Sequence, residues 1–199
     1  MHLIEPFYNW RNLYTSYEDK ASPFYGKEYN ECTYTNTIYN QYIHPQWDDI
    51  GSPTLFIKIL YCNYEYGYAV IEMFGEWNDC LNNDIMLFKR NVIDLLAYAG
   101  INKYILIMEN ILNFHASDDL YYEEWFDDNG EGWIALINAR QHVVEEFRKE
   151  QIDQFFIYDS LKEIPWRALH PLQLCKLIDV SGIKDLTAGD FCQNSLPMP

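Results

Sequence analysis

The sequence lacks the features that mark disulfide-stapled, zinc-binding or membrane-spanning chains. Its five cysteines are an odd number among 199 residues, and no two have C-x-x-C spacing. This argues against a disulfide framework and a zinc knuckle, and favours a reducing, cytoplasmic location. The longest apolar runs, residues 55–61 and 104–108, are far below the roughly 20 residues of a membrane helix. Residues 1–13 have no basic segment followed by an apolar run, so we expect neither a signal peptide nor membrane association.

Positive charge is scarce in this chain. It has 14 basic and 30 acidic residues, which gives a net charge of −16. Such a surface repels phosphate backbones, so nucleic acid is not an expected partner. A basic protein partner would suit it, and acidity that simply keeps the protein soluble is the alternative. The sequence leaves self-association open.

Motifs for common cofactors are also missing. There is no G-x-G-x-x-G, no P-loop and no G-x-S-x-G elbow, so we predict neither a cofactor nor a bound metal. Hydrophobic residues make up 49% of the chain, which is enough to bury a core without disulfides. The composition therefore predicts a globular domain of ordinary size.

Two compositional zones divide the chain. Residues 1–52 are rich in tyrosine and poor in leucine and valine, so they cannot build a core alone. We expect this aromatic-rich N-terminal extension to pack on the main domain, with an edge strand in the β-prone run at 33–43 and a short helix near 6–17. Residues 53–190 are predicted to form the α/β domain, and residues 191–199 a frayed tail.

From residue 54 the hydrophobic pattern alternates between strand and helix. The predicted elements are strands at 55–61, 68–74, 104–108 and 154–158, and helices at about 84–99, 132–149 and 171–178. Gly75 is expected to end the second strand, and Gly132 to begin the second helix. The nearly all-apolar run 104–108 predicts a central parallel strand. The expected fold class is therefore α/β, with a mixed sheet around a βαβαβ core.

Ligands of parallel sheets usually approach the carboxyl ends of the strands. Polar, ionisable and aromatic residues follow two predicted strands and form a candidate ligand or interaction site: Glu76, Trp77, Asp79, Asn113, His115, Asp118 and Asp119. His115 and the two aspartates after it could bind a metal or transfer protons. No fixed ligand spacing is present, however. The alternative is that Asn113, Ser117 or Asp118 caps the following helix.

The most acidic stretch of the chain is Ser117–Glu131, which contains no lysine or arginine. Large aromatic residues interrupt the acids, and Tyr122 and Trp125 complete the candidate interaction site. Negative charge with aromatic anchors suits a protein-contact surface. A solvated helix face with its aromatic side chains turned inward is the alternative.

Four parts follow one another between Tyr68 and about Leu186: a strand that runs into Phe74–Trp77, a helix and a second strand, the run Ile111–Asp118, and the segment Leu174–Ile183. Together they resemble the STAS domain, the family of anti-sigma-factor antagonists. Phe74–Trp77 is similar to the family's Gly-Glu-Leu-Asp type turn after a strand, Ile111–Asp118 to the apolar run into its Asp-Ser-Ser-Gly helix start, and Leu174–Ile183 to its closing helix.

This resemblance implies a regulatory module without enzymatic activity. In STAS domains a serine at the helix start is phosphorylated to switch partner binding, and Ser117 occupies the matching place. Ala116 and Asp118 depart from the family pattern on either side of it. Phosphate adds charge and bulk at an interface, which gives such a switch a physical basis.

Three functional hypotheses follow. The first is a STAS-like module that binds a protein partner through an acidic and aromatic face. The second is a small enzyme or metal-dependent hydrolase using Glu76, Asp79, His115 and Asp118, which requires these side chains to converge. The third is a small-ligand binding protein with its site at the same strand ends.

Overall fold

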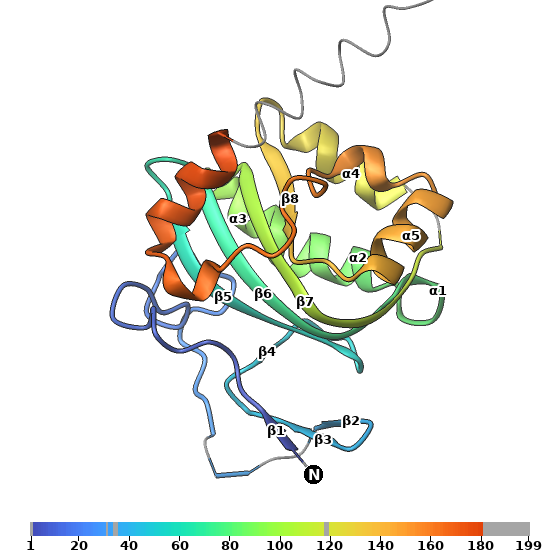
Figure 1. Cartoon of the computed structure of the whole chain (residues 1–199). Helices are drawn as coiled ribbons and strands as arrows, with labels where there is room; N and C mark the ends of the chain where they lie inside the picture. Colours follow the sequence, from blue (N-terminus) through green and yellow to red (C-terminus); the bar gives the residue numbers. More distant parts are fainter. Residues whose placement is uncertain (1, 31, 34–35, 118–119, 181–199) are drawn as a thin grey trace, which may run out of the picture.

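A computed structural model describes residues 2–30, 32–33, 36–117 and 120–180 of the chain. Its centre is a five-stranded mixed sheet in the order β4-β5-β6-β7-β8 (Figure 1). The strands are β4 Asp48–Asp49, β5 Leu55–Asn63, β6 Tyr68–Asn78, β7 Lys103–His115 and β8 Trp133–Ile137. β5 pairs antiparallel with both of its neighbours, β4 and β6, and β6, β7 and β8 are parallel. The expected α/β class with a mixed sheet is confirmed, and β7 is the central parallel strand predicted from its apolar run.

Helices connect the parallel strands. Between β6 and β7 lie α1 Asp79–Asn82, α2 Asp84–Phe88, the π-helical segment η1 Lys89–Ile93 and α3 Asp94–Tyr98. Between β7 and β8 lies α4 Leu120–Asp128, and α5 Gln141–Lys149 follows β8. Two 3-10 turns follow, η2 Asp153–Phe155 and η3 Trp166–Ala168, and residues 171–180 are helical.

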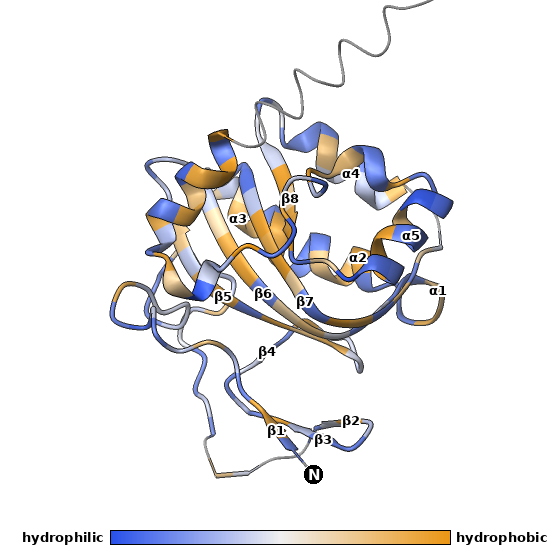
Figure 2. Cartoon of the chain, in the orientation of Figure 1, coloured by the Kyte–Doolittle hydropathy of each residue, from blue (hydrophilic) through white to orange (hydrophobic). Residues whose placement is uncertain are grey.

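The sheet is covered on both faces. On one face, side chains of β5–β8 pack against α2, η1, α3, α4 and α5. On the other face they pack against Trp10, Leu161, Trp166 and the helix at 171–180. Figure 2 shows hydrophobic residues concentrated on strands β5–β8, while the helices carry hydrophilic residues as well. The parallel strands are therefore buried on both faces, as their apolar sequences require.

The N-terminal zone contributes a second, smaller sheet. Its strands are β1 His2–Ile4, β2 Thr37–Ile38 and β3 Gln41–Ile43, in the order β1-β3-β2. Ile38, Ile43 and Trp47 pack with Phe56 and Phe74 of the main sheet. Residues 6–17 form turns within the described chain, so the short helix predicted there is wrong. An aromatic side chain holds this segment on the domain instead: the buried Trp10 donates its indole N–H to the Leu169 carbonyl at 3.1 Å.

The predicted helix over residues 132–149 is wrong in its first half. Residues 133–137 form β8, and only 141–149 are helical. Gly132 explains the difference, because a Cβ there would lie 1.8 Å from the Asn102 carbonyl oxygen. This close approach lets Trp133 N–H donate to the same carbonyl at 3.1 Å. It aligns the run Trp133–Ile137 beside β7. A short apolar run of this kind is compatible with a buried strand as well as with a helix, so the sequence pattern did not distinguish the two.

Gly75 does not end its strand. β6 continues to Asn78, and Gly75 sits within it at φ +113°. A Cβ there would lie 2.0 Å from the Thr54 carbonyl oxygen, and the pairing with β7 shifts register between Gly75 and Glu76. Gly75 therefore forms a bulge that re-aims the end of β6.

Two further predictions need correction. The strand expected at 154–158 is reduced to a single bridge between Ile157 and Ala135. The helix expected at 84–99 contains a π turn, which changes its phase. Leu95, which regular periodicity places inward, is 48% exposed, while Leu96 is buried. Gly182 and the tail at 191–199 lie outside the described residues.

Within the described part of the chain, no helix is long and apolar enough to cross a membrane.

Candidate functional site

Glu76 and Asn113 meet where β6 and β7 approach their ends. The two residues are register partners, and the Asn113 side-chain amide donates to the Glu76 carboxylate at 3.1 Å. The Tyr39 phenol from the N-terminal zone donates to the same Glu76 oxygen. Two members of the candidate site therefore lie side by side, and the Glu76 carboxylate already has two protein donors.

Asp79 lies in a separate, buried place at the start of α1. Its carboxylate accepts hydrogen bonds from the Trp77 indole at 3.0 Å, the Ile85 amide at 2.8 Å and the Tyr122 phenol at 2.6 Å. Burial raises the pKa of Asp79 to about 6, although these three donors oppose the rise. Asp79 thus joins the β6 end, α2 and α4 inside the core.

The aromatic members of the predicted interaction face point inward. Trp77 and Tyr122 are fully buried and stack with ring centroids 6.2 Å apart. Trp125 is 1% exposed and packs edge-on against Phe88 and Tyr104. These three residues therefore cannot anchor a partner on the surface. The alternative interpretation, aromatics turned into the core, is the one that the structure bears out.

The predicted acid–base set does not share contacts. Glu76 and Asp79 have different hydrogen-bond partners, and His115 is exposed at the end of β7. Asp118 and Asp119 lie outside the described residues. Within the ranges that are described, no group of three or more His, Cys, Asp or Glu is arranged to hold a metal ion.

Ser117 is exposed on the segment that leads from β7 to α4. This segment contacts the start of α1, because the Cys80 thiol donates to the Ala116 carbonyl at 2.8 Å. Leu81 in α1 and Leu120 in α4 are 83% and 65% exposed. Ser117 therefore lies on an open stretch of surface beside the carboxyl ends of β6 and β7.

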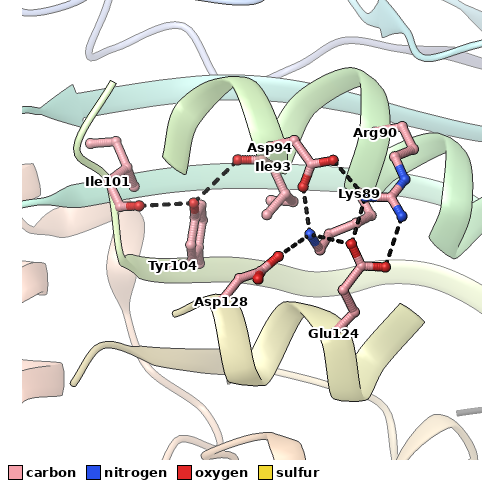
Figure 3. A network of polar contacts seen from close by, with 8 residues as sticks. All are labelled: Lys89, Arg90, Ile93, Asp94, Ile101, Tyr104, Glu124 and Asp128. Carbon is pink, nitrogen blue, oxygen red and sulfur yellow. Dashed lines mark hydrogen bonds and ion pairs between the residues drawn. The ribbon is translucent and has the colours of Figure 1, made fainter. Parts of the chain in front are cut away.

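The π-helical segment supplies cations to one side of α4. Lys89 is 1% exposed, and its ammonium lies 2.5 Å from Asp94, 2.7 Å from Asp128 and 3.4 Å from Glu124 (Figure 3). Burial alone lowers the pKa of Lys89, but hydrogen bonds to Asp128 and Asp94 outweigh it, and the pKa is raised. Lys89 is therefore a charged lysine inside a ring of carboxylates.

Arg90 extends the same network on its outer side. Its guanidinium binds both oxygens of Glu124, at 2.6 and 2.8 Å, and contacts Asp94 at 2.9 Å. Hydrogen bonds from Arg90 lower the pKa of Glu124. Two cations thus offset three carboxylates, and Glu124 and Asp128 of α4 are engaged within the chain.

The remaining acids of the α4 region face solvent without a cation. Glu123 and Asp127 lie one turn apart in α4, and Glu131 follows three residues after its end; all three are exposed. No ion pair reaches them from any described residue. Beside them Phe126 is 46% exposed and contacts Phe155. We call Glu123, Phe126, Asp127 and Glu131 the outer α4 face.

A second carboxylate pair was missed by the sequence reasoning. Glu72 of β6 is 2% exposed and accepts from the Phe7 amide at 2.8 Å. Arg167 of η3 bridges Glu72, at 3.7 Å, to Glu109 of β7. Glu109 also accepts from the Trp166 indole at 3.3 Å. The sequence did contain a signal for this pair, because Glu72 is an acid within the apolar run of β6.

This junction ties both terminal segments to the sheet. Burial raises the pKa of Glu72 to about 7, with the Phe7 amide and Arg167 opposing the rise and Glu109 adding to it. Because one guanidinium lies between the two carboxylates, we interpret the cluster as a clasp that joins residues 6–7 and 166–167 to β6 and β7.

No protein-family model matches the chain, and no curated protein matches it. The likeness to STAS domains therefore stays a prediction.

Proposed function

We propose that this chain is a protein-interaction module, without enzymatic activity of its own, that binds a basic partner through the outer α4 face. The observation that carries the proposal is the division of charge around α4. Glu124 and Asp128 are offset by Lys89 and Arg90, whereas Glu123, Asp127 and Glu131 have no cation within the described chain. A partner with clustered lysine or arginine would complete this face.

The distribution of basic residues supports the same proposal. Of the 14 basic residues in the chain, nine are in ion pairs within the described residues. They are Lys27, Lys58, Lys89, Arg90, Lys103, Arg148, Lys149, Lys162 and Arg167. The unpaired surface is therefore more negative than the sequence average, which steers basic partners and repels nucleic acid.

The acid–base and metal hypotheses have less support. Glu76 and Asp79 are each engaged by separate protein donors, and His115 makes no contact with either of them that would indicate a catalytic pair. Protein binding uses surface charge that has no internal partner, so it accounts for more of the observed arrangement.

The test is affinity capture from the lysate of the protein's own cells, using the full chain as bait. The triple variant Glu123→Lys, Asp127→Lys, Glu131→Lys is compared with a matched control, Glu5→Lys, Glu28→Lys, Glu65→Lys, which makes the same charge change at other exposed acids. We expect wild type and control to capture the same basic protein and the triple variant to lose it. Equal capture by all three baits would contradict the proposal.

The resemblance to STAS domains adds a regulatory element to this proposal. Ser117 is exposed and lies three residues before α4, so a phosphate there would add negative charge beside the proposed interface. We expect phosphate on Ser117 in protein purified from its own cells, detected by mass spectrometry. We also expect Ser117→Glu to bind the captured partner more tightly than Ser117→Ala. Identical affinity of the two variants, with no modification detected, would remove Ser117 from the account.

A further inference from the structure

A small pocket lies between the N-terminal segment 6–17 and strand β5. The empty space at this pocket amounts to about 410 Å³, a figure that includes open solvent, so the enclosed part is narrow. Its walls are largely aromatic, and include Phe7, Trp10, Tyr14 and Tyr17. Such walls favour a flat apolar ring, which stacks or packs edge-on against them.

The same pocket carries a local excess of positive charge. Lys58 of β5 and Arg11 both line it. Asp48, which is fully buried, faces two lysines at once: Lys27 at 3.1 Å and Lys58 at 3.3 Å. One carboxylate therefore offsets two ammonium groups, and Arg11 has no ion-pair partner within the described residues. This surplus is unusual in a chain with a net charge of −16.

Nearby acids do not cancel this charge. Asp19 accepts hydrogen bonds from the phenols of Tyr14 and Tyr64. Glu72, the cross-strand neighbour of Lys58, accepts from the Phe7 amide and faces Arg167. Neither acid lines the pocket. Burial lowers the pKa of Lys58, although the Asp48 carboxylate opposes this shift. The Lys58 ammonium also donates to the Tyr29 hydroxyl at 3.0 Å and lies 4.1 Å from the centroid of that ring, so a ligand anion would add a further contact to those it already has.

The lining also contains a buried hydroxyl group. Ser16 is 1% exposed, and its oxygen makes no hydrogen bond of ordinary geometry within the described residues. This hydroxyl still interacts with the Tyr29 phenol, where it opposes the rise in the Tyr29 pKa that burial causes, and a ligand could give it a better-aligned hydrogen bond. The pocket therefore combines an aromatic wall, two cations and a polar group able to bond a ligand.

We propose that this pocket binds a small aromatic anion, with its ring against the aromatic wall and its negative group toward Lys58 and Arg11. A neutral ring would leave the cations without a counter-charge, and a cationic ring would be repelled by them. The site lies on the N-terminal segment and β5, so it is separate from the outer α4 face and independent of the function proposed above.

The experiment titrates the full chain with benzoate and with phenyl phosphate, and follows tryptophan fluorescence and the thermal unfolding midpoint. Benzyl alcohol and benzylamine are the neutral and cationic controls. We expect saturable binding of at least one anion, a rise in its unfolding midpoint by mass action, and no comparable response to the controls. No saturable response to either anion, or equal binding of benzyl alcohol, would overturn the proposal.

Variants then locate the site. Arg11→Gln removes an exposed charge with no ion pair, and Lys58→Met removes a mostly buried charge that pairs with Asp48. Lys103→Met is the matched control, because it removes a partly exposed lysine that pairs with Asp179 elsewhere. We expect Arg11→Gln and Lys58→Met each to weaken anion affinity by about tenfold or more, as for a lost charge-assisted hydrogen bond. If Lys58→Met fails to fold, Arg11→Gln alone decides. Unchanged affinity in Arg11→Gln, or loss in Lys103→Met instead, would contradict the assignment.

Discussion

Glu72 shows how one buried side chain links pH to stability. Its carboxyl is 2% exposed and belongs to the clasp that joins both terminal segments to the sheet. Burial raises its pKa from 4.5 to about 7. The folded state therefore holds this proton more tightly than the unfolded state between about pH 4.5 and 7. Stability from Glu72 is fully present below that window and is lost as the pH rises through it.

The variant Glu72→Gln should isolate this effect, because it stays neutral at every pH and can still accept from the Phe7 amide. A shift of this size corresponds to about 3 kcal/mol. We expect the unfolding free energy of the variant, relative to wild type, to rise by up to about that amount between pH 4.5 and 8. Urea unfolding at several pH values measures it. The exposed Glu123→Gln should show a flat difference, and a flat difference for Glu72→Gln as well would show that burial does not perturb this group.

At the scale of single residues, the sequence predicted burial correctly only where a pattern determines whether a side chain points into the core or toward solvent. The helical spacing of Ile85, Phe88 and Val92 identified core positions correctly. Trp77, Tyr122 and Trp125 were placed on a contact face although all three are buried. An aromatic residue is equally at home in a core and at an interface, so its type alone does not give its direction. The partners of Glu72 lie 65 and 95 residues away, as Phe7 and Arg167, and sequence spacing does not bring them together.

At the scale of elements, the π turn η1 and helix α4 form one electrostatic unit. The π turn adds one residue to a helical turn and so changes the phase of the helix relative to regular α-helical winding. In this arrangement Lys89 lies among Asp94, Glu124 and Asp128 (Figure 3). The phenol of Tyr104 meets the Ile101 and Ile93 carbonyl oxygens at 3.0 and 3.4 Å beside this network. α4 is thereby fixed against the helices that precede β7.

Lys89→Met should show what this unit contributes. Removing a buried cation leaves three carboxylates with Arg90 alone, and we expect a loss of about 1–3 kcal/mol in unfolding free energy at pH 7. The carboxylates of Asp94 and Glu124 have lowered pKa values, so their stabilisation is present above their unfolded pKa values and is lost as the pH falls. The gap between variant and wild type should therefore narrow near pH 3 to 4.

Denaturant unfolding at pH 7 and at low pH measures this gap. Lys149→Met is the matched control, because Lys149 pairs with Glu146 and Glu150 on an exposed surface, where solvent screens ion pairs, so its loss of unfolding free energy should be clearly smaller. Equal losses of unfolding free energy in Lys89→Met and Lys149→Met would contradict the expectation that burial makes the Lys89 ion pairs more stabilising.

Strands and helices were predicted correctly where residue composition and hydrophobic periodicity indicated the same kind of element. The hairpin β5–β6 and the central strand β7 follow from apolar runs of strand length. The sequence predicted the helix after this strand at about 132–149, whereas α4 at 120–128 is the crossover helix and β8 follows it. The deciding contact is the approach of Gly132 to Asn102, a tertiary feature that local periodicity does not contain.

At the scale of the whole molecule, charge is sorted rather than spread evenly. Cations are concentrated in internal ion pairs and beside the pocket near β5, whereas the outer α4 face keeps acids without a cation in the described chain. The net charge of −16 predicted the sign of the surface but not this division. The proposed interface lies within the acidic segment 117–131 that the sequence singled out, and the structure shows which of its described side chains have no cation partner.

Binding of a basic partner to the outer α4 face is tested most directly by the dissociation constant of the captured partner. This constant is measured over a range of salt concentrations for wild type and for the Glu123→Lys, Asp127→Lys, Glu131→Lys variant. We predict wild-type affinity that falls steeply with salt, and a triple variant at least about tenfold weaker at low salt, with most of the salt dependence gone. Equal affinity and equal salt dependence in the two proteins would contradict it.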